Sequence, residues 1–230
     1  MDNNSWGENI QQQMFQFWEK HLGAEHKMGF EVFTSPIPKD PSIVFMGINP
    51  GSNFEGYHPR MDPFLEDGDF SLPDSHDYAV GGEDYEVANF LRDHIFSSRE
   101  DRLTDSVETN RYYLRTNDET EHSDLQERLG EAWEDYVDFC FDTDQELIER
   151  TDPDVIIAFS IETWKTLHDD DRYTTKYHDD YNRPSGNARL IIEAELDGIP
   201  VIVLHHPSYL GSEDMEKAEK IAQPMLEAYL

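Results

Sequence analysis

The sequence predicts an α/β fold, a three-layer α/β/α sandwich with a short, mostly parallel central sheet. Two apolar runs, residues 43–47 and 201–204, each end in a short polar turn, which is typical of buried strands that build a site at the carboxyl edge of an open sheet. Between them, apolar segments of strand length alternate with segments of helical periodicity, which favours parallel strands covered on both faces. We expect a single domain over residues 1–230, because no stretch has the composition of a linker.

The expected elements follow from the spacing of apolar residues along the chain. Ile10, Met14 and Trp18 share one helical face and predict a first helix over residues 9–22. Further helices are expected over residues 85–97, 124–150 (bent near 142–143), 161–168 and 212–228. Strands are expected at residues 43–47, 112–116, 155–159, 188–194 and 200–205. The segment 169–187 is strongly polar, and the aperiodic segment 52–82 has the length of a functional loop.

The charge of the chain bears on its solvent and its partners. Fifty acidic residues against eighteen basic ones give a formal net charge of −32. Three interpretations are open: an acidic DNA mimic or chaperone-like binder, an acidic protein with a cationic partner, or a protein kept soluble in concentrated salt. The third is favoured, because only seven residues are lysine and the acids are spread along the whole chain. At 1 M salt the Debye length is about 3 Å, which screens most of the self-repulsion of such a surface.

Several classes of protein are disfavoured by composition. The single cysteine, Cys140, excludes an intramolecular disulfide and a cysteine-ligated cluster. Residues 1–8 lack a signal-peptide pattern, and no apolar run is long enough to span a membrane, so we expect a cytoplasmic protein. The repeated His-Asp-Asp at 168–170 and 178–180 offers cation ligands, but a solvated acidic loop is the favoured interpretation, and we expect no metal or other cofactor.

Polar turns follow the first and the last apolar runs. The first turn is Gly-Ile-Asn-Pro-Gly at 47–51, and the second is His-Pro-Ser-Tyr-Leu at 206–210. Taken alone, each is equally consistent with a structural turn, because proline fixes φ, glycine supplies positive φ and histidine can cap a helix. Together, in this order and each after a buried strand, they are much more specific.

On these motifs the chain resembles the uracil-DNA glycosylase superfamily. The turn at 47–51 looks like the first motif of the mismatch-specific and single-strand-selective branches, and 206–210 fits the pattern His-Pro-Ser-x-Leu of the second motif. The resemblance covers residues 43–51 and about 138–210 and includes Cys140 and the approach to the strand at 155–159. It implies a monomeric enzyme that hydrolyses the N-glycosidic bond of uracil or a related deaminated base, acting on uracil-containing or mismatched DNA in base-excision repair. The absence of a four-cysteine cluster argues against the iron–sulfur branches.

The resemblance assigns roles that fit the chemistry. Asn49 would orient the attacking water through its amide oxygen, and His206 would donate a hydrogen bond to the departing base. An amide cannot accept the proton of the water, so a slow enzyme is expected. The other residues of the first motif would line the base pocket: Gly47, Ile48, Pro50 and Gly51.

Further candidates follow from the need to take a base out of the duplex. Leu210 is expected to fill the vacated stack, or else to be a core-facing leucine. Phe64 is the first choice for a platform under the base, with Phe54 and Tyr57 as alternatives, although any of the three can simply pack the loop. Asn117, just past the expected second strand, either reads the Watson–Crick edge of the base or forms a turn. Contacts to the DNA backbone are expected from Ser52, Pro207 and Ser208.

The acidic composition departs from the basic DNA-facing surface of the superfamily. The basic residues expected near the carboxyl edge are few: Arg111, Arg115, Lys217 and Lys220. Two alternatives therefore stay open beside the glycosylase. One is a catalytically weak or inactive module of this fold that binds nucleic acid or protein, and the other is a hydrolase of free nucleosides or nucleotides.

Overall fold

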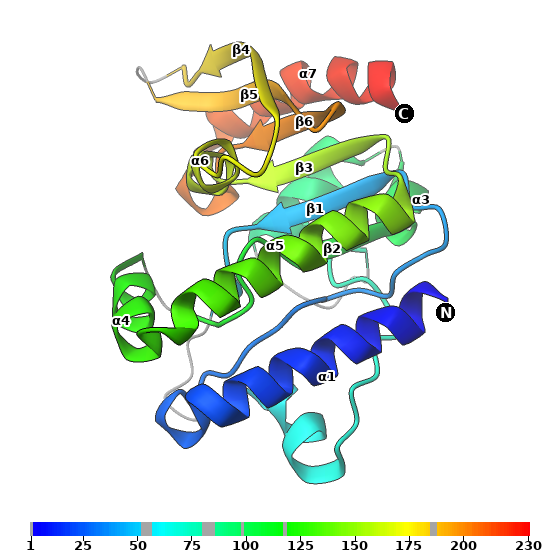
Figure 1. Cartoon of the computed structure of the whole chain (residues 1–230). Coiled ribbons are helices and arrows are strands. Elements are labelled where there is room, and N and C mark those ends of the chain that lie inside the picture. Colours follow the sequence, from blue (N-terminus) through cyan, green and yellow to red (C-terminus); the bar gives the residue numbers. More distant parts are fainter. Residues whose placement is uncertain (1, 52–56, 80–85, 98, 117–118, 185–187) are drawn as a thin grey trace.

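The computed structural model describes residues 2–51, 57–79, 86–97, 99–116, 119–184 and 188–230. In this part of the chain, six strands form one sheet in the order β2-β1-β3-β6-β5-β4 (Figure 1). The strands are β1 Ile43–Gly47, β2 Ser106–Asn110, β3 Val155–Phe159, β4 Thr175–Asn182, β5 Arg189–Leu196 and β6 Ile199–Leu204. Strands β2, β1, β3 and β6 are parallel, whereas β5 and β4 complete one side of the sheet as antiparallel strands.

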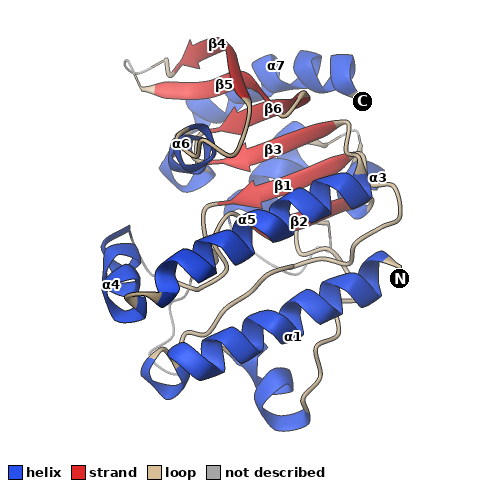
Figure 2. Ribbon diagram, viewed as in Figure 1, coloured by secondary structure: helices blue, strands red, loops and turns tan. Residues whose placement is uncertain are grey.

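Helices cover both faces of the sheet, which gives the three-layer α/β/α sandwich that the sequence predicts (Figure 2). One face packs against α1 (Asn3–His21), α5 (Ala132–Thr151) and α6 (Ile161–His168). The other face packs against α2 (Glu86–Phe90), the π turn η4 (Leu91–Ile95), α3 (Glu100–Thr104) and α7 (Ser212–Tyr229). The remaining elements are α4 (Glu119–Leu129) and the short turns η1 (Gly23–Glu25), η2 (Pro59–Met61), η3 (Pro63–Asp67) and η5 (Pro207–Tyr209).

Three of the parallel strands, β1, β3 and β6, are apolar because both of their faces are buried. In β1, Val44 and Met46 belong to the core on the α1 and α5 side, while Ile43 and Phe45 belong to the core on the α7 side. Strands β3 and β6 alternate in the same way. This continuous burial explains why the apolar runs could be recognised as strands. None of the helices in the described segments has the length and apolar character needed to cross a bilayer.

Most expected elements are confirmed within a few residues, but the second strand is not. It is β2 at 106–110, whereas the expected segment 112–116 contributes only isolated bridges, Leu114 with Phe30 and Thr116 with Gly51. Strand β2 was hidden by its polar composition, Ser-Val-Glu-Thr-Asn, although all five residues are buried. The polar side chains of β2 can be buried because they bond to partners elsewhere in the fold, for example Thr109 Oγ1, which donates to the Val32 carbonyl at 3.0 Å.

Other boundaries also differ from expectation for physical reasons. Helix α1 begins at Asn3, earlier than expected, because the Asp2 carboxylate caps it by accepting from the Ser5 amide at 2.9 Å. Helix α5 passes through residues 142–143 without a break, and the break lies instead at Gly130, whose φ of 53° is left-handed. The polar segment 169–187 contains β4, an exposed edge strand held by its pairing with β5 and therefore without an apolar pattern.

Candidate functional site

The carboxyl ends of the parallel strands β2, β1, β3 and β6 lie along one edge of the sheet (Figure 1). Met46 of β1 pairs with Ala158 of β3, which in turn pairs with Val203 of β6. Asn49 and His206 both follow this level by three residues. Neighbouring strands are about 4.8 Å apart, so the two chain segments leave the sheet at the same height and about 10 Å from each other, with β3 between them.

Asn49 is fixed through the nitrogen of its amide. Its Nδ2 donates to Thr116 Oγ1 at 2.7 Å and to the Pro50 carbonyl at 3.2 Å. Thr116 is itself buried, and its amide donates to the Pro50 carbonyl at 3.2 Å. Because both side-chain bonds use the nitrogen, Oδ1 is the end of the amide that can accept a hydrogen bond from a water or a substrate.

The turn at 47–51 is anchored along its length by the segment that follows β2. The Arg111 amide donates to the Gly47 carbonyl at 2.8 Å, and the Tyr112 amide donates to the Ile48 carbonyl at 2.9 Å. These two bonds continue the β1–β2 ladder beyond the strands themselves. The backbone that presents Asn49 is therefore held on the β2 side by main-chain bonds.

Arg115 fixes the far end of the same turn. Its Nη1 donates to the Gly51 carbonyl at 2.6 Å, and its Nη2 pairs with Glu31 Oε2 at 2.5 Å. Glu31 also pairs with Arg60 at 2.5 Å, and Arg60 pairs with Asp77. We call these four side chains the Arg115 cluster. It links the turn to η2 and to the segment that precedes α2.

The arginines after β2 are not part of a basic surface. Arg115 is buried in the Arg115 cluster, and Arg111 is buried between Asp144, at 3.3 Å, and Asp170, at 2.8 Å. The expectation that they contribute to a DNA-facing footprint is therefore wrong. Acidic side chains from distant segments pair with both arginines and neutralise their charge inside the protein.

Asn110 lies beside Gly47 at the end of β2. The two residues are paired in the ladder, and a Cβ added to Gly47 would come within 2.4 Å of Asn110 Oδ1. A side chain at position 47 would therefore have to displace this amide. Asn117, the amide expected just past the second strand, lies outside the described residues. With the second strand at 106–110, the amide at its end is Asn110.

His206 is held in one tautomer by the turn that it begins. Its Nδ1 accepts from the Ser208 amide at 3.3 Å, so the neutral ring carries its proton on Nε2 and can donate from there. Burial lowers the pKa of His206 below its usual value, against a smaller raising effect of the nearby Glu86 carboxylate. The ring is therefore neutral at pH 7 and acts as a hydrogen-bond donor rather than as a cation.

A second histidine precedes it in the chain. His205 is partly buried, and its Nδ1 is enclosed without a hydrogen-bond partner in the described structure. Burial lowers the pKa of His205 as well, reinforced by the charge of Arg183. Arg183 itself pairs with Asp214 at 2.5 Å at the start of α7, so its charge is also largely compensated.

The end of β3 lies between the two motifs. Ser160 has a φ of 80° and a ψ of 148°, a conformation that residues other than glycine rarely adopt. It is held there by three contacts: its amide donates to the Leu204 carbonyl at 2.8 Å, its Oγ accepts from the Thr163 amide at 3.1 Å, and that Oγ lies 3.0 Å from Thr163 Oγ1. Strain of this kind is concentrated at functional sites, and nothing in the sequence pattern pointed to this residue.

The remaining predicted residues are placed as follows. Phe64 lies in an aromatic cluster, parallel to Phe30 at 5.3 Å and to Phe70 at 5.4 Å between ring centroids, so that serving as a base platform would require it to leave this packing. Leu210 is partly buried against the core on the α7 side. Pro207 is buried and Ser208 is exposed in η5. Ser52 and Phe54, like Asn117, lie outside the described residues.

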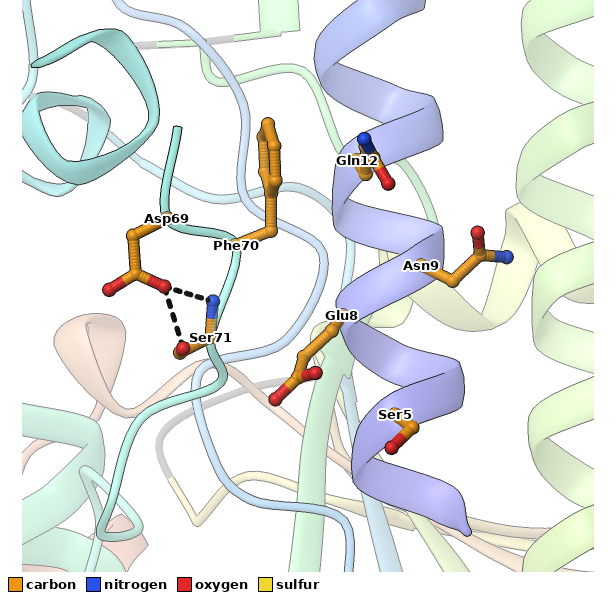
Figure 3. Close-up of a pocket in the computed structure, with 7 residues that line it drawn as sticks. All are labelled: Ser5, Glu8, Asn9, Gln12, Asp69, Phe70 and Ser71. Carbon is orange, nitrogen blue, oxygen red and sulfur yellow. Dashed lines mark hydrogen bonds between the residues drawn. The ribbon is translucent and has the colours of Figure 1, made fainter. Parts of the chain in front are cut away.

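Two hollows of the surface lie elsewhere. One, of about 310 Å³, lies between α1 and residues 69–71, where Ser71 is bonded to the Asp69 carboxylate (Figure 3). It is lined by Ser5, Glu8, Asn9, Gln12, Asp69, Phe70 and Ser71. The other, of about 360 Å³, lies between α1 and α5. Neither is lined by residues 47–51 or 205–210, so the strand edge is a candidate on its chemistry and not on the depth of a cavity.

A metal centre is not formed by the side chains in the described segments, where no three His, Cys, Asp or Glu residues are grouped to hold an ion. A scan against protein-family models found no match to this chain, and a search of curated proteins found none either. The chemistry of the strand edge therefore has to be argued from its own residues.

Proposed function

We propose that the protein is a monofunctional DNA glycosylase that hydrolyses the N-glycosidic bond of uracil or a related deaminated base in DNA. The observation that carries the proposal is the joint position of Asn49 and His206, which follow β1 and β6 at the same level, where the two chain segments leave the sheet about 10 Å apart. One offers an amide oxygen and the other an N–H donor. That spacing suits a base and its sugar held between an acceptor and a donor.

The reaction places opposite demands on these two groups. As the C1′–N bond breaks, its electron pair leaves with the base and positive charge develops on the sugar. Asn49 Oδ1 would hold the water whose oxygen forms the new bond to C1′, while the Nε2–H of His206 would stabilise the negative charge on the base oxygen. A neutral donor suits this role, since the lowered pKa of His206 keeps the ring uncharged in the resting protein. The proton that the water loses passes through solvent to the departing base anion. Because the Asn49 amide cannot take up this proton, turnover is expected to be slow.

Selection of the base is assigned to Asn110. Uracil presents an N3–H donor next to the O4 acceptor, and an amide can bond both at once through Oδ1 and Nδ2. Cytosine presents the reverse pattern and would be rejected by an amide held in one orientation. The contact between Asn110 and Gly47 limits the freedom of that amide.

The protein is expected to act as a cytoplasmic monomer on uracil-containing or mismatched DNA. The test is incubation with uracil-containing oligonucleotides, single- and double-stranded, in low and in molar KCl, followed by alkaline cleavage. We expect strand scission by the wild type and a loss of about 100-fold or more in His206→Ala and Asn49→Ala. His178→Ala and Asn182→Ala, on the exposed strand β4, serve as matched controls and are expected to cleave normally.

Absence of scission on every substrate and at both salt concentrations would refute the glycosylase. Binding of abasic DNA that is unaffected by His206→Ala and Asn49→Ala would favour the non-catalytic module instead. Turnover of free nucleosides without turnover of DNA would indicate the nucleoside hydrolase.

A further inference from the structure

The turn η5 presents a large aromatic ring to solvent next to the candidate site. Tyr209 is 70% exposed, the highest value among the exposed large hydrophobic side chains of the described residues, ahead of Tyr177 at 46%. Exposure of such a ring leaves much apolar surface in contact with water. A ring in this position is therefore available to a partner.

The backbone under Tyr209 is rigid in spite of this exposure. The Tyr209 amide donates to the His206 carbonyl at 3.1 Å, and the Leu210 amide donates to the Pro207 carbonyl at 2.9 Å. Pro207 is buried and its ring fixes φ. The Ser208 amide is engaged by His206 Nδ1. Only the two side-chain torsions of Tyr209 remain to be ordered on binding, which keeps the entropic cost of a contact low.

Leu210 points into the protein while its neighbour points out. Leu210 packs against the core on the α7 side. This core contains Ala218 and Ala222 of α7 and Phe90 of α2. The large apolar side chain that this turn exposes to solvent is thus Tyr209 and not Leu210.

The ring of Tyr209 stands beside both histidines of the motif. Its centroid lies 5.9 Å from that of His206 and 6.2 Å from that of His205. A flat group resting on Tyr209 would therefore lie next to the imidazole that is proposed to contact the departing base. The three rings together form one aromatic edge on the carboxyl side of β6.

The chemistry of the surroundings favours a nucleobase over a phosphate as the occupant. The net charge of −32 repels the DNA backbone, and Arg183 is already paired with Asp214. Counterion release, which drives most phosphate contacts, becomes a weak contribution in concentrated salt. Stacking on an aromatic ring depends on the π face of the base, so it depends little on the salt concentration or on the identity of the base.

We propose that Tyr209 stacks on a base of the DNA next to the nucleotide that enters the site and fills the space which that nucleotide leaves. The inference rests on the proposed function for its partner, DNA, but not on catalysis. It identifies Tyr209 as a DNA-binding residue of a strand edge that is otherwise poor in basic side chains.

The test uses DNA that cannot react: an oligonucleotide carrying a tetrahydrofuran abasic analogue flanked by 2-aminopurine. Wild type and Tyr209→Phe are expected to quench the 2-aminopurine fluorescence on binding. Tyr209→Ala is expected to lose the quenching and to bind about 5- to 150-fold more weakly, the range for one aromatic–base stack. Leu210→Ala is expected to retain the quenching, and Tyr177→Ala, an exposed tyrosine of β4, serves as the matched control.

Three outcomes would overturn the inference: no binding of this DNA by the wild type, unchanged binding and quenching by Tyr209→Ala, or a loss in Leu210→Ala as large as that in Tyr209→Ala. If the wild-type protein quenches the fluorescence but does not cleave uracil-containing DNA, the DNA-binding role of Tyr209 is supported and the glycosylase function is rejected. If Tyr209→Ala cleaves uracil-containing DNA normally and still quenches the fluorescence at the abasic site, the glycosylase function is supported and the role of Tyr209 is rejected.

Discussion

The free energy of unfolding of the wild-type protein is expected to fall as the pH rises because of Glu108. The Glu108→Gln substitution is expected to abolish this part of the fall. Glu108 lies in β2, two residues before Asn110, and its Oε2 is buried without a hydrogen-bond partner in the described structure. Burial raises the pKa of the Glu108 carboxyl to about 8, against the smaller lowering effects of the nearby Thr34 and Tyr78 side chains. The carboxyl is therefore protonated in the folded protein at pH 7.

The size of the effect follows from the difference between the folded and unfolded states. In the unfolded chain the pKa of the same carboxyl is near its ordinary value of 4.5, so between these values the folded state holds a proton that the unfolded state has released. A group of this kind lowers the free energy of unfolding steadily as the pH rises through that window. The loss between pH 5 and pH 9 amounts to about 4 kcal/mol from this one side chain. Glutamine has nearly the same shape but does not ionise.

The assay is urea denaturation of wild type and Glu108→Gln in molar KCl at each pH from 5 to 9, followed by tryptophan fluorescence. All other groups titrate alike in both proteins, so the difference between them isolates Glu108. We expect that difference to grow by about 4 kcal/mol in favour of the variant from pH 5 to pH 9. Glu216→Gln, at an exposed position of α7, is the control and is expected to show no such trend. A difference between wild type and Glu108→Gln that is constant across this range would refute the reasoning.

Two further substitutions test how the candidate turn is built. Gly47→Ala places a methyl group against Asn110 Oδ1, and we expect a loss of about 1–3 kcal/mol in stability together with slower uracil excision. In the double variant Gly47→Ala/Asn110→Ala we expect the stability to return, because the crowded amide is gone. The preference for uracil over cytosine is not expected to return. Glu31→Gln leaves Arg60 and Arg115 without their shared carboxylate, and we expect a loss of about 3–5 kcal/mol in urea denaturation and a fall in the excision rate constant.

Controls for these substitutions are available in the same molecule. Gly51→Ala adds a methyl group to the same turn at a position where the added Cβ meets no atom within 4 Å, so it separates crowding at Asn110 from a general effect of alanine. Asp138→Asn removes an exposed partner of Arg172 and is expected to change stability by less than about 1 kcal/mol. Equal stability losses in Gly47→Ala and Gly51→Ala, or in Glu31→Gln and Asp138→Asn, would contradict the structural reasoning.

The parts of the fold that the sequence predicts are those whose stability is local or uniformly apolar. Strands β1, β3 and β6 are runs of buried aliphatic residues, and they position both motifs. Strand β2 was missed because most of its residues are polar, and the burial of such side chains depends on partners tens of residues away in the chain, such as His76 for Ser106 and Val32 for Thr109. A pattern read along the chain does not contain those partners.

The same limit applies to the candidate site. Asn49 and His206 could be chosen because each directly follows an apolar run. Arg115 was expected near the carboxyl edge of the sheet, but only the fold shows that it pairs with Glu31 and that its guanidinium donates to the Gly51 carbonyl. Ser160 looked like an ordinary residue after a strand, because its unusual backbone conformation leaves no trace in the sequence.

The Arg115 cluster has a consequence for the proposed glycosylase when the salt concentration changes. Ion pairs at the surface weaken as the Debye length shrinks, whereas pairs enclosed by protein are screened much less. The hydrogen bond from Arg115 to the Gly51 carbonyl is therefore expected to persist at ionic strengths that abolish long-range attraction or repulsion between the protein and DNA. Salt would then alter how often the two molecules meet but not the shape of the turn once they have met, so that KM carries the salt dependence and kcat stays constant.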